Sequence, residues 1–279
     1  MRHTDFQFAS GQVIGRDHRQ VPKNCQDGYH IAHSNDYTVA IVTDGCGSDR
    51  SAEAMWDLNG QTQHNEVGAK LGAVLAAQAV LRAAIERGVD RLNWSEVQFN
   101  LASQLYQLAR SMGGNIRETI ESFFLFTIVG VLLSDETATF FALGDGVVVV
   151  NGEVSSIGPF PGNKPPYIGY SAIPGSALEI EPGDLAFRIV ASIPLEFLDS
   201  FLIGCDGVDD LIKVAEHRLP GLSDTVGGIE QFWCGDAYFT NPALLSRRLK
   251  LIGRDWPKAN PSPGLLPDDT TLIVGRRKP

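Results

Sequence analysis

The chain has 279 residues, which is enough for one large domain or two small ones and for a substantial hydrophobic core. Its 43% hydrophobic and 20% charged residues are ordinary for a globular protein. A net charge of -10 and a pI near 5.0 argue against a nucleic-acid partner and against an anionic membrane partner, because both require a basic surface.

The cysteines and the apolar runs favour a cytoplasmic protein. The four cysteines show no CxxC spacing, which is expected in a reducing compartment. The N-terminal MRHTDFQFASG has no apolar signal region, and the most apolar run, residues 123–133, is too short to cross a bilayer. We therefore expect no membrane partner.

Along the chain, the first predicted elements are three short strands separated by a polar loop. Strands are expected at residues 6–14, 29–32 and 37–43. The loop after the first strand is rich in cationic groups and ends in a carboxylate: Arg16, His18, Arg19, Lys23 and Asp27.

The third strand carries the most informative pattern. Residues 39–42 form a continuous apolar run, typical of a strand buried on both faces, and the run stops at Asp44-Gly45. An isolated Asp-Gly is most simply a hairpin turn. The pattern recurs, however, at Asp145-Gly146 and Asp206-Gly207, each after an apolar strand. Three such strands suggest carboxylates that converge on one point.

Two long amphipathic helices follow. In residues 66–87 the apolar face is predicted from Val67, Leu71, Val74, Leu75, Leu81 and Ile85. In residues 94–112 it is predicted from Val97, Leu101, Leu105, Leu108 and Met112. Asn93 with Glu96 resembles a capping box, and glycines follow both helices. Because both helices are amphipathic, each is expected to cover one side of a sheet.

The middle of the chain is predicted to be a β-meander followed by a flap. Strands are expected at residues 123–133, 137–143 and 147–150, with Asn151-Gly152 as a type I′ hairpin. Residues 159–183 are rich in Pro and Gly and have no periodicity, which predicts a mobile surface flap.

The remaining elements resume the same architecture. Strands are expected at residues 186–191 and 200–204, a helix at residues 209–219, and a further helix capped by Asn241. A Pro-rich loop then ends in Asp268-Asp269, before a final strand at residues 270–275.

Carboxylates therefore flank many of the predicted strands: Asp27, Asp44, Asp145, Asp206, Asp209, Asp210, Asp268 and Asp269. Several of them placed together without a cation would repel one another and take up protons. Oxygen-only ligands are the preference of Mg²⁺ or Mn²⁺ rather than of zinc. These residues predict a Mg²⁺ or Mn²⁺ site between two sheets, whose obvious chemistry is phosphoryl hydrolysis.

The ordered motifs resemble those of the metal-dependent serine/threonine protein phosphatases of type 2C, in a bacterial-type member. NCQDG is similar to the family's Asn-Glu-Asp box, VAIVTDGCGS to its Asp-Gly-His-Gly box, FALGDG to its Gly-Asp-Ser box, and IGCDGVDDL and DDTTLIV to its last two. The resemblance covers about residues 11–274. It implies one α+β domain over residues 1–279: a four-layer α-β-β-α sandwich of two antiparallel sheets flanked by helix pairs.

The resemblance also implies roles by position. Asp44 would bridge two metal ions, the Gly45 carbonyl would bind one of them, and Asp206 and Asp268 would complete one of the two sites. Asp27 would act on the other ion through water. Asp145 and Asp210 match the positions of a weaker third ion, whereas Asp209 and Asp269 are expected to lie outside the ligand set.

Two departures from the family pattern concern substrate phosphate. The usual phosphate-binding Arg position holds Pro22, so that role passes to Arg19, Lys23 or His18, or is absent. The usual His after Asp-Gly, a proposed general acid, is Cys46. We expect His18 to contact the phosphate or to supply a proton, with its pKa lowered by the charges of Arg16 and Arg19.

These features together predict a hydrolase that removes phosphate from phosphoserine or phosphothreonine on proteins, opposing a serine/threonine kinase. The attack is expected from a metal-bound hydroxide on two Mn²⁺ or Mg²⁺ ions. Two alternatives stay open: an inactive relative that binds phosphoproteins as a regulatory module, and a metal-dependent hydrolase of small phosphate esters.

Overall fold

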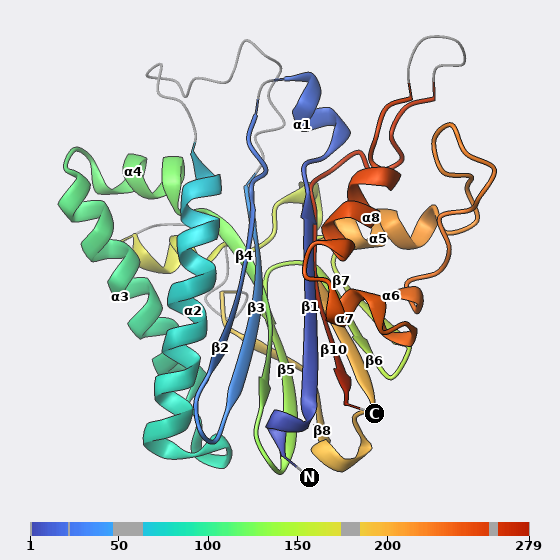
Figure 1. Cartoon of the computed structure of the whole chain (residues 1–279). Helices are drawn as coiled ribbons and strands as arrows, with labels where there is room; N and C mark the ends of the chain where they lie inside the picture. The colour runs from blue at the N-terminus through green and yellow to red at the C-terminus, as the bar shows by residue number, and fades with distance from the viewer. Residues whose placement is uncertain (1, 22, 47–63, 174–184, 257–261, 279) are drawn as a thin grey trace.

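The computed structural model describes residues 2–21, 23–46, 64–173, 185–256 and 262–278 (Figure 1). Two five-stranded sheets form its centre, and every strand pair is antiparallel. One sheet contains, in order, β1 (Phe6–Val13), β10 (Thr270–Arg277), β9 (Ser200–Gly204), β6 (Gly146–Val150) and β7 (Glu153–Ile157). The other contains β2 (Asp27–His33), β3 (Thr38–Gly45), β4 (Phe126–Leu133), β5 (Thr137–Leu143) and β8 (Arg188–Pro194).

Helices cover the outer face of each sheet. Figure 1 shows one helical group beside β2 to β5 and the other beside β1, β10 and β6. The first group is α2 (Asn65–Arg87), α3 (Trp94–Met112) and α4 (Ile116–Phe123). The second is α5 (Gly207–Lys213), α6 (Gln231–Cys234), α7 (Ala237–Thr240) and α8 (Leu244–Ile252), while α1 (Arg16–Gln20) lies beyond the strand ends. Short 3₁₀ turns are η1 (His3–Asp5), η3 (Val89–Arg91), η4 (Pro161–Asn163), η5 (Ile168–Ala172) and η6 (Leu195–Phe197).

Three hydrophobic cores separate these four layers. The central core lies between the sheets, where Val42 and Phe140 of one sheet belong to the same buried cluster as Phe201 and Ile273 of the other. The other two cores lie between each sheet and its helices. The predicted α-β-β-α sandwich is therefore confirmed, and burial on both faces explains the uninterrupted apolar run in β3.

The buried face of α2 differs from the predicted one. Val67, Val74 and Ile85 are exposed, and the residues that face the sheet are mostly Ala and Gly. These small residues allow a close approach, since a Cβ on Gly72 would lie 2.2 Å from the Phe126 ring. The predicted face was right for Leu81, which is buried, and for Leu71 and Leu75, which pack against the core. It was wrong for the other three positions, because periodicity detects large side chains and overlooks a packing surface made of small ones. By length and composition α2 could cross a membrane, but 56% of its most apolar stretch is buried within the protein.

The other predicted helix, α3, has the expected bounds and the expected Asn93 cap, whose side chain accepts hydrogen bonds from Ser95 N and Glu96 N. The helix α4 was not predicted. It occupies the start of the apolar run assigned to a strand from residue 123, and β4 begins only at Phe126. Asn115 caps α4 in the same way.

The segment from β5 to β6 is not the predicted meander, because the two strands belong to different sheets. Gly144 (φ 98°) and Gly146 (φ 143°) have backbone conformations that favour glycine, and the chain crosses between the sheets at Asp145. The Asn151-Gly152 turn joins β6 to β7 with positive φ at both residues, as a type I′ hairpin requires.

Only the start of the described flap lies at the surface: residues 159–162 and 164 are exposed or half-buried, whereas most of residues 165–173 are buried. Tyr167, Ile168, Ala172 and Ile173 are buried in the core between α2, α3 and the sheet. A Cβ on Gly169 would lie 2.3 Å from the Phe124 carbonyl oxygen, so the segment is closely packed. The high Pro and Gly content and the lack of periodicity gave no sign that part of this segment belongs to the core. Residues 174–183 of the predicted flap lie outside the described residues.

In the last part of the chain two helix boundaries differ from those predicted. The helix after Asp206, α5, ends at Lys213 rather than near residue 219. Asn241 lies before a turn, where its side chain accepts from Ala243 N, and α8 starts at Leu244.

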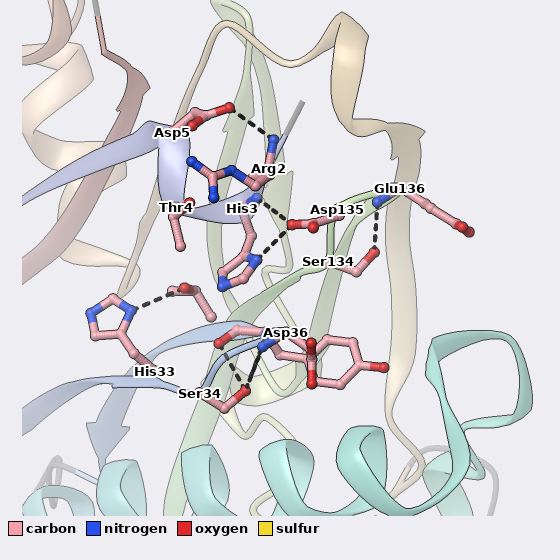
Figure 2. A network of polar contacts seen from close by, with 12 residues as sticks. Arg2, His3, Thr4, Asp5, His33, Ser34, Asp36, Ser134, Asp135 and Glu136 are labelled. Atoms are coloured by element: carbon pink, nitrogen blue, oxygen red, sulfur yellow. Dashed lines mark hydrogen bonds and ion pairs between the residues drawn. The ribbon is translucent and has the colours of Figure 1, made fainter.

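A polar network closes the end of the sheets near the N-terminus (Figure 2). The backbone N and the ring Nδ1 of the buried His3 lie 2.9 and 2.7 Å from Asp135 Oδ1, in the turn between β4 and β5. Beside it, His33 Nδ1 lies 2.9 Å from Thr38 Oγ1. This network ties the N-terminal turn of one sheet to the other sheet.

Candidate metal centre

At the opposite end, both sheets deliver carboxylates to one edge. Asp27 begins β2 and pairs directly with Asp44, at the end of β3. From the other sheet, Asp206 follows β9 and Asp268 precedes β10, while Asp145 lies at the crossing between the sheets. Antiparallel strands alternate in direction, so residues distant in sequence meet at this edge.

Asp27 is the most enclosed of these carboxylates. It is fully buried, its Oδ2 accepts a hydrogen bond from Cys205 Sγ at 3.3 Å, and its Oδ1 has no partner. Burial, followed by the charge of Asp269, raises the pKa of Asp27 to about 8. The interior around Asp27 therefore favours either a proton or a cation on this group.

The neighbouring carboxylates show the same effect. Burial, then the charges of Asp206 and Asp27, raises the pKa of Asp44 well above its ordinary value. Burial and Asp268 raise the pKa of Asp206 to about 7, although a hydrogen bond with Asp44 opposes the rise. Burial raises the pKa of Asp145 to about 6. Partial burial raises the pKa of Asp268, whose side chain is still 52% exposed, against the hydrogen bond from Asp269 N and the charge of His18.

These residues fit a divalent metal ion. The Oδ1 atoms of Asp27 and Asp206 are buried and have no hydrogen-bond partner, although each is a strong acceptor. Mutual repulsion among the carboxylates requires positive charge, and oxygen donors suit Mg²⁺ or Mn²⁺. At Gly45 a Cβ would lie 2.8 Å from the carbonyl oxygens of Asn65 and Gln26, so only glycine fits.

The further predicted ligand Asp210 lies at the border of this cluster. Its Oδ1 pairs with Lys213 Nζ at 2.9 Å, and its charge contributes to the raised pKa of Asp268. Asp209 instead accepts a hydrogen bond from Ser156 Oγ at 2.7 Å. The ligand assignments of Asp27, Asp44, Gly45, Asp145, Asp206, Asp210 and Asp268 stay predictions.

His18, on α1, lies beside the last carboxylate pair. Its Nδ1 is 3.0 Å from Asp269 Oδ2 and 3.9 Å from Asp268 Oδ1. These three side chains bring possible ligand atoms within 4.8 Å of one another. The contact with Asp269 raises the pKa of His18, against a lowering by burial and by Lys23. The prediction of a lowered pKa was wrong because the facing carboxylates outweigh both burial and the charge of Lys23.

The arginines of α1 point to other partners. Arg19 donates to the carbonyl oxygens of Ile14 and Gly253 at 2.7 and 2.6 Å and pairs with Asp255. Arg16 contacts Asp17 and the Gly264 carbonyl oxygen. Arg19 thus anchors α1 to a neighbouring loop, and phosphate binding by Arg19 or by Lys23 stays a prediction. Pro22 lies outside the described residues.

Sequence reasoning missed two uncharged groups at the centre. The buried Cys205 receives a hydrogen bond from Thr271 N at 3.1 Å and links β10 to Asp27. The Tyr167 phenol forms a hydrogen bond with Cys46, and its pKa is raised by burial and then by the Cys46, Asp44 and Asp145 charges, so it stays protonated. In the sequence, only the motif position of Cys46 indicated a functional role in this region. Nothing in residues 164–169 (KPPYIG) indicated that Tyr167 lies near the carboxylates.

Comparisons with known proteins identify the family and the fold. The family model described as Protein phosphatase 2C matches residues 14–217. A bacterial serine phosphatase has 15% identity and a TM-score of 0.50 over 99% of this chain and 98% of that one. A point variant of a bacterial serine phosphatase has 16% identity and a TM-score of 0.52, over 99% and 100%.

A third solved structure, the serine/threonine phosphatase Stp1 from Staphylococcus aureus, is 15% identical with a TM-score of 0.48, over 99% of this chain and 95% of that one. No curated protein sequence matches significantly. At such identities, the two bacterial serine phosphatase structures establish a shared fold.

Proposed function

The chain belongs to the protein phosphatase 2C family, and we propose that it is a metal-dependent phosphatase acting on phosphoserine or phosphothreonine in proteins. The observation that carries this proposal is the convergence of carboxylates from both sheets on one edge, two of which, Asp27 and Asp206, keep buried oxygens without partners. Its substrates would be products of a serine/threonine kinase. The alternatives of a phosphoprotein-binding regulator and of a hydrolase of small phosphate esters are outcomes of the test below.

We assign the metal ligands by the family positions that the carboxylates at this edge match. Asp44 pairs with Asp27 and is influenced by the charges of Asp206 and Asp27; it would serve two ions, while Asp206 and Asp268 would complete one site. Asp145 and Asp210 would serve a weaker third. When bound, Mn²⁺ or Mg²⁺ supplies positive charge that stabilises the phosphoryl group and makes a water molecule more acidic.

His18 is the side chain proposed to act on the substrate. Beside Asp268 and Asp269 its imidazolium is favoured, which provides a positive hydrogen-bond donor for a phosphate oxygen. The same imidazolium can donate a proton to the leaving serine oxygen. Serine alkoxide is a poor leaving group that needs this proton, whereas p-nitrophenolate leaves well without one. His18→Ala should therefore slow hydrolysis of a phosphoserine peptide far more than that of p-nitrophenyl phosphate. Equal modest effects on both substrates would assign His18 no role in protonating the leaving group.

Phosphate release from phosphoserine and phosphothreonine peptides tests the proposed function. We expect turnover with Mn²⁺ or Mg²⁺, none with a chelator, and a fall of several orders of magnitude in Asp44→Asn with the fold retained. Asp135→Asn, at the far end of the sheets, is the matched control. Hydrolysis of nucleotides alone would indicate a small-ester hydrolase. Phosphopeptide binding without turnover would indicate a regulatory module.

A further inference from the structure

Asp269 was expected from the sequence to lie outside the set of metal ligands. Its side chain is 2% exposed. Oδ1 accepts a hydrogen bond from Gly15 N at 2.6 Å, and Oδ2 accepts one from Gln26 N at 2.6 Å. His18 Nδ1 lies 3.0 Å from the same Oδ2. One buried carboxylate thus connects its own segment, before β10, with the start of α1 and with the start of β2.

Two of these contacts position the backbone on either side of the metal centre. Gly15 immediately precedes α1, and Gln26 immediately precedes Asp27 in β2. The first turn of α1 also docks on the segment before β10, through Arg16 N to Leu266 O at 2.9 Å and Asp17 N to Pro267 O at 3.0 Å. A Cβ on Gly15 would lie 2.5 Å from the Pro267 carbonyl oxygen, so the two backbones are in close contact.

The third contact matters because α1 is short. A helix of five residues has little stability of its own, so the direction of a side chain on it depends on tertiary contacts. The His18 side chain is 15% exposed, and its Nδ1 lies within ion-pair distance of Asp269. The ring therefore has one defined orientation, in which Nε2 is the nitrogen left for another partner.

We propose that Asp269 is the positioning residue that holds His18 for contact with the substrate phosphate. This inference rests on the proposed function, since it takes the phosphate ester as the ligand. Asp269 acts through the imidazole: it fixes the ring by Nδ1 and fixes the helix that carries the ring by Gly15. Asp269 is assigned no direct contact with the phosphate.

Inorganic phosphate binding to the Mn²⁺-loaded protein, measured by calorimetry, is the first test. We expect Asp269→Asn and His18→Ala each to weaken phosphate binding about 10- to 100-fold, the range for a hydrogen bond to a charged group. In the double variant the two losses should not add, because both remove the same interaction. Asp135→Asn, which alters a similar Asp–His pair with His3, should bind phosphate as the wild type does.

Additive losses in the double variant, or unchanged phosphate affinity in Asp269→Asn, would overturn the inference. Since Asp269→Asn also disturbs two backbone contacts and could prevent folding, the Mg²⁺-loaded wild type offers a second test. Its NMR spectrum should show a His18 Nδ1–H proton protected from exchange by the buried Asp269 contact, absent from His18→Ala; lack of that signal contradicts the contact. A wild type that hydrolyses no phosphopeptide refutes the proposed function separately.

Discussion

Asp27→Asn should change how the stability of the metal-free protein depends on pH. Asp27 has a pKa of about 8 in the folded protein against an ordinary 3.8. Between those values the folded protein keeps a proton that the unfolded chain releases, so its stability falls as pH rises, by about 1.4 kcal/mol per pH unit. From about pH 5 to about pH 8, Asp27 alone should account for about 4 kcal/mol. Asn has no proton to lose and can still accept from Cys205 Sγ.

Urea unfolding in the presence of a chelator, at several pH values across that range, measures the difference. Deprotonation of Asp145 and Asp206 lowers the stability of both proteins as pH rises. Only the wild type also loses the contribution of Asp27, so its stability should fall more steeply with pH than that of Asp27→Asn. In the Asp135→Asn control, the lost group has a pKa lowered by its hydrogen bonds from His3, and its contribution disappears only as pH falls below about 4. Parallel curves for wild type and Asp27→Asn would refute the electrostatic reasoning.

Two further predictions test the packing that sequence patterns did not reveal. Gly72→Ala should destabilise the protein by about 1–3 kcal/mol, because its Cβ would overlap the Phe126 ring, whereas Val74→Ala on the exposed side of α2 should cost under about 0.5 kcal/mol. Denaturant unfolding measures both free energies. A larger loss of stability in Val74→Ala than in Gly72→Ala would indicate that Val74 lies on the buried face, as periodicity predicted. Ile168→Ala should cost about 2–5 kcal/mol, since Ile168 is fully buried, and a loss near zero would show that the segment is a surface flap after all.

The layers of the fold were predictable because large apolar residues mark them. β3 and β9 appear in the sequence as continuous apolar runs, and these runs are buried. The buried face of α2 was not predictable in this way, since Ala and Gly carry almost no hydrophobic signal. The burial of Tyr167 and Ile168 depends on close contact with α4, which only the tertiary structure brings near them.

The candidate site was predictable as a set of strand-end carboxylates and not as a geometry. Each Asp-Gly motif placed a carboxylate at a strand end, and antiparallel pairing brought Asp27 to Asp44. The charge on His18 was mispredicted because the sequence shows its neighbours Arg16 and Arg19 but not Asp269, which faces it from 251 positions later in the chain. Electrostatics depends on the nearest charge in space, and here that charge is non-local.

The most direct test of the metal centre is the anomalous scattering of Mn²⁺ in crystals of the wild type and of Asp44→Asn. The account predicts Mn²⁺ peaks in the wild type in contact with Asp44, Asp206 and Asp268, and their loss or marked weakening in the variant. Absence of Mn²⁺ from this edge of the sheets in the wild type, or equal peaks in Asp44→Asn, would contradict it.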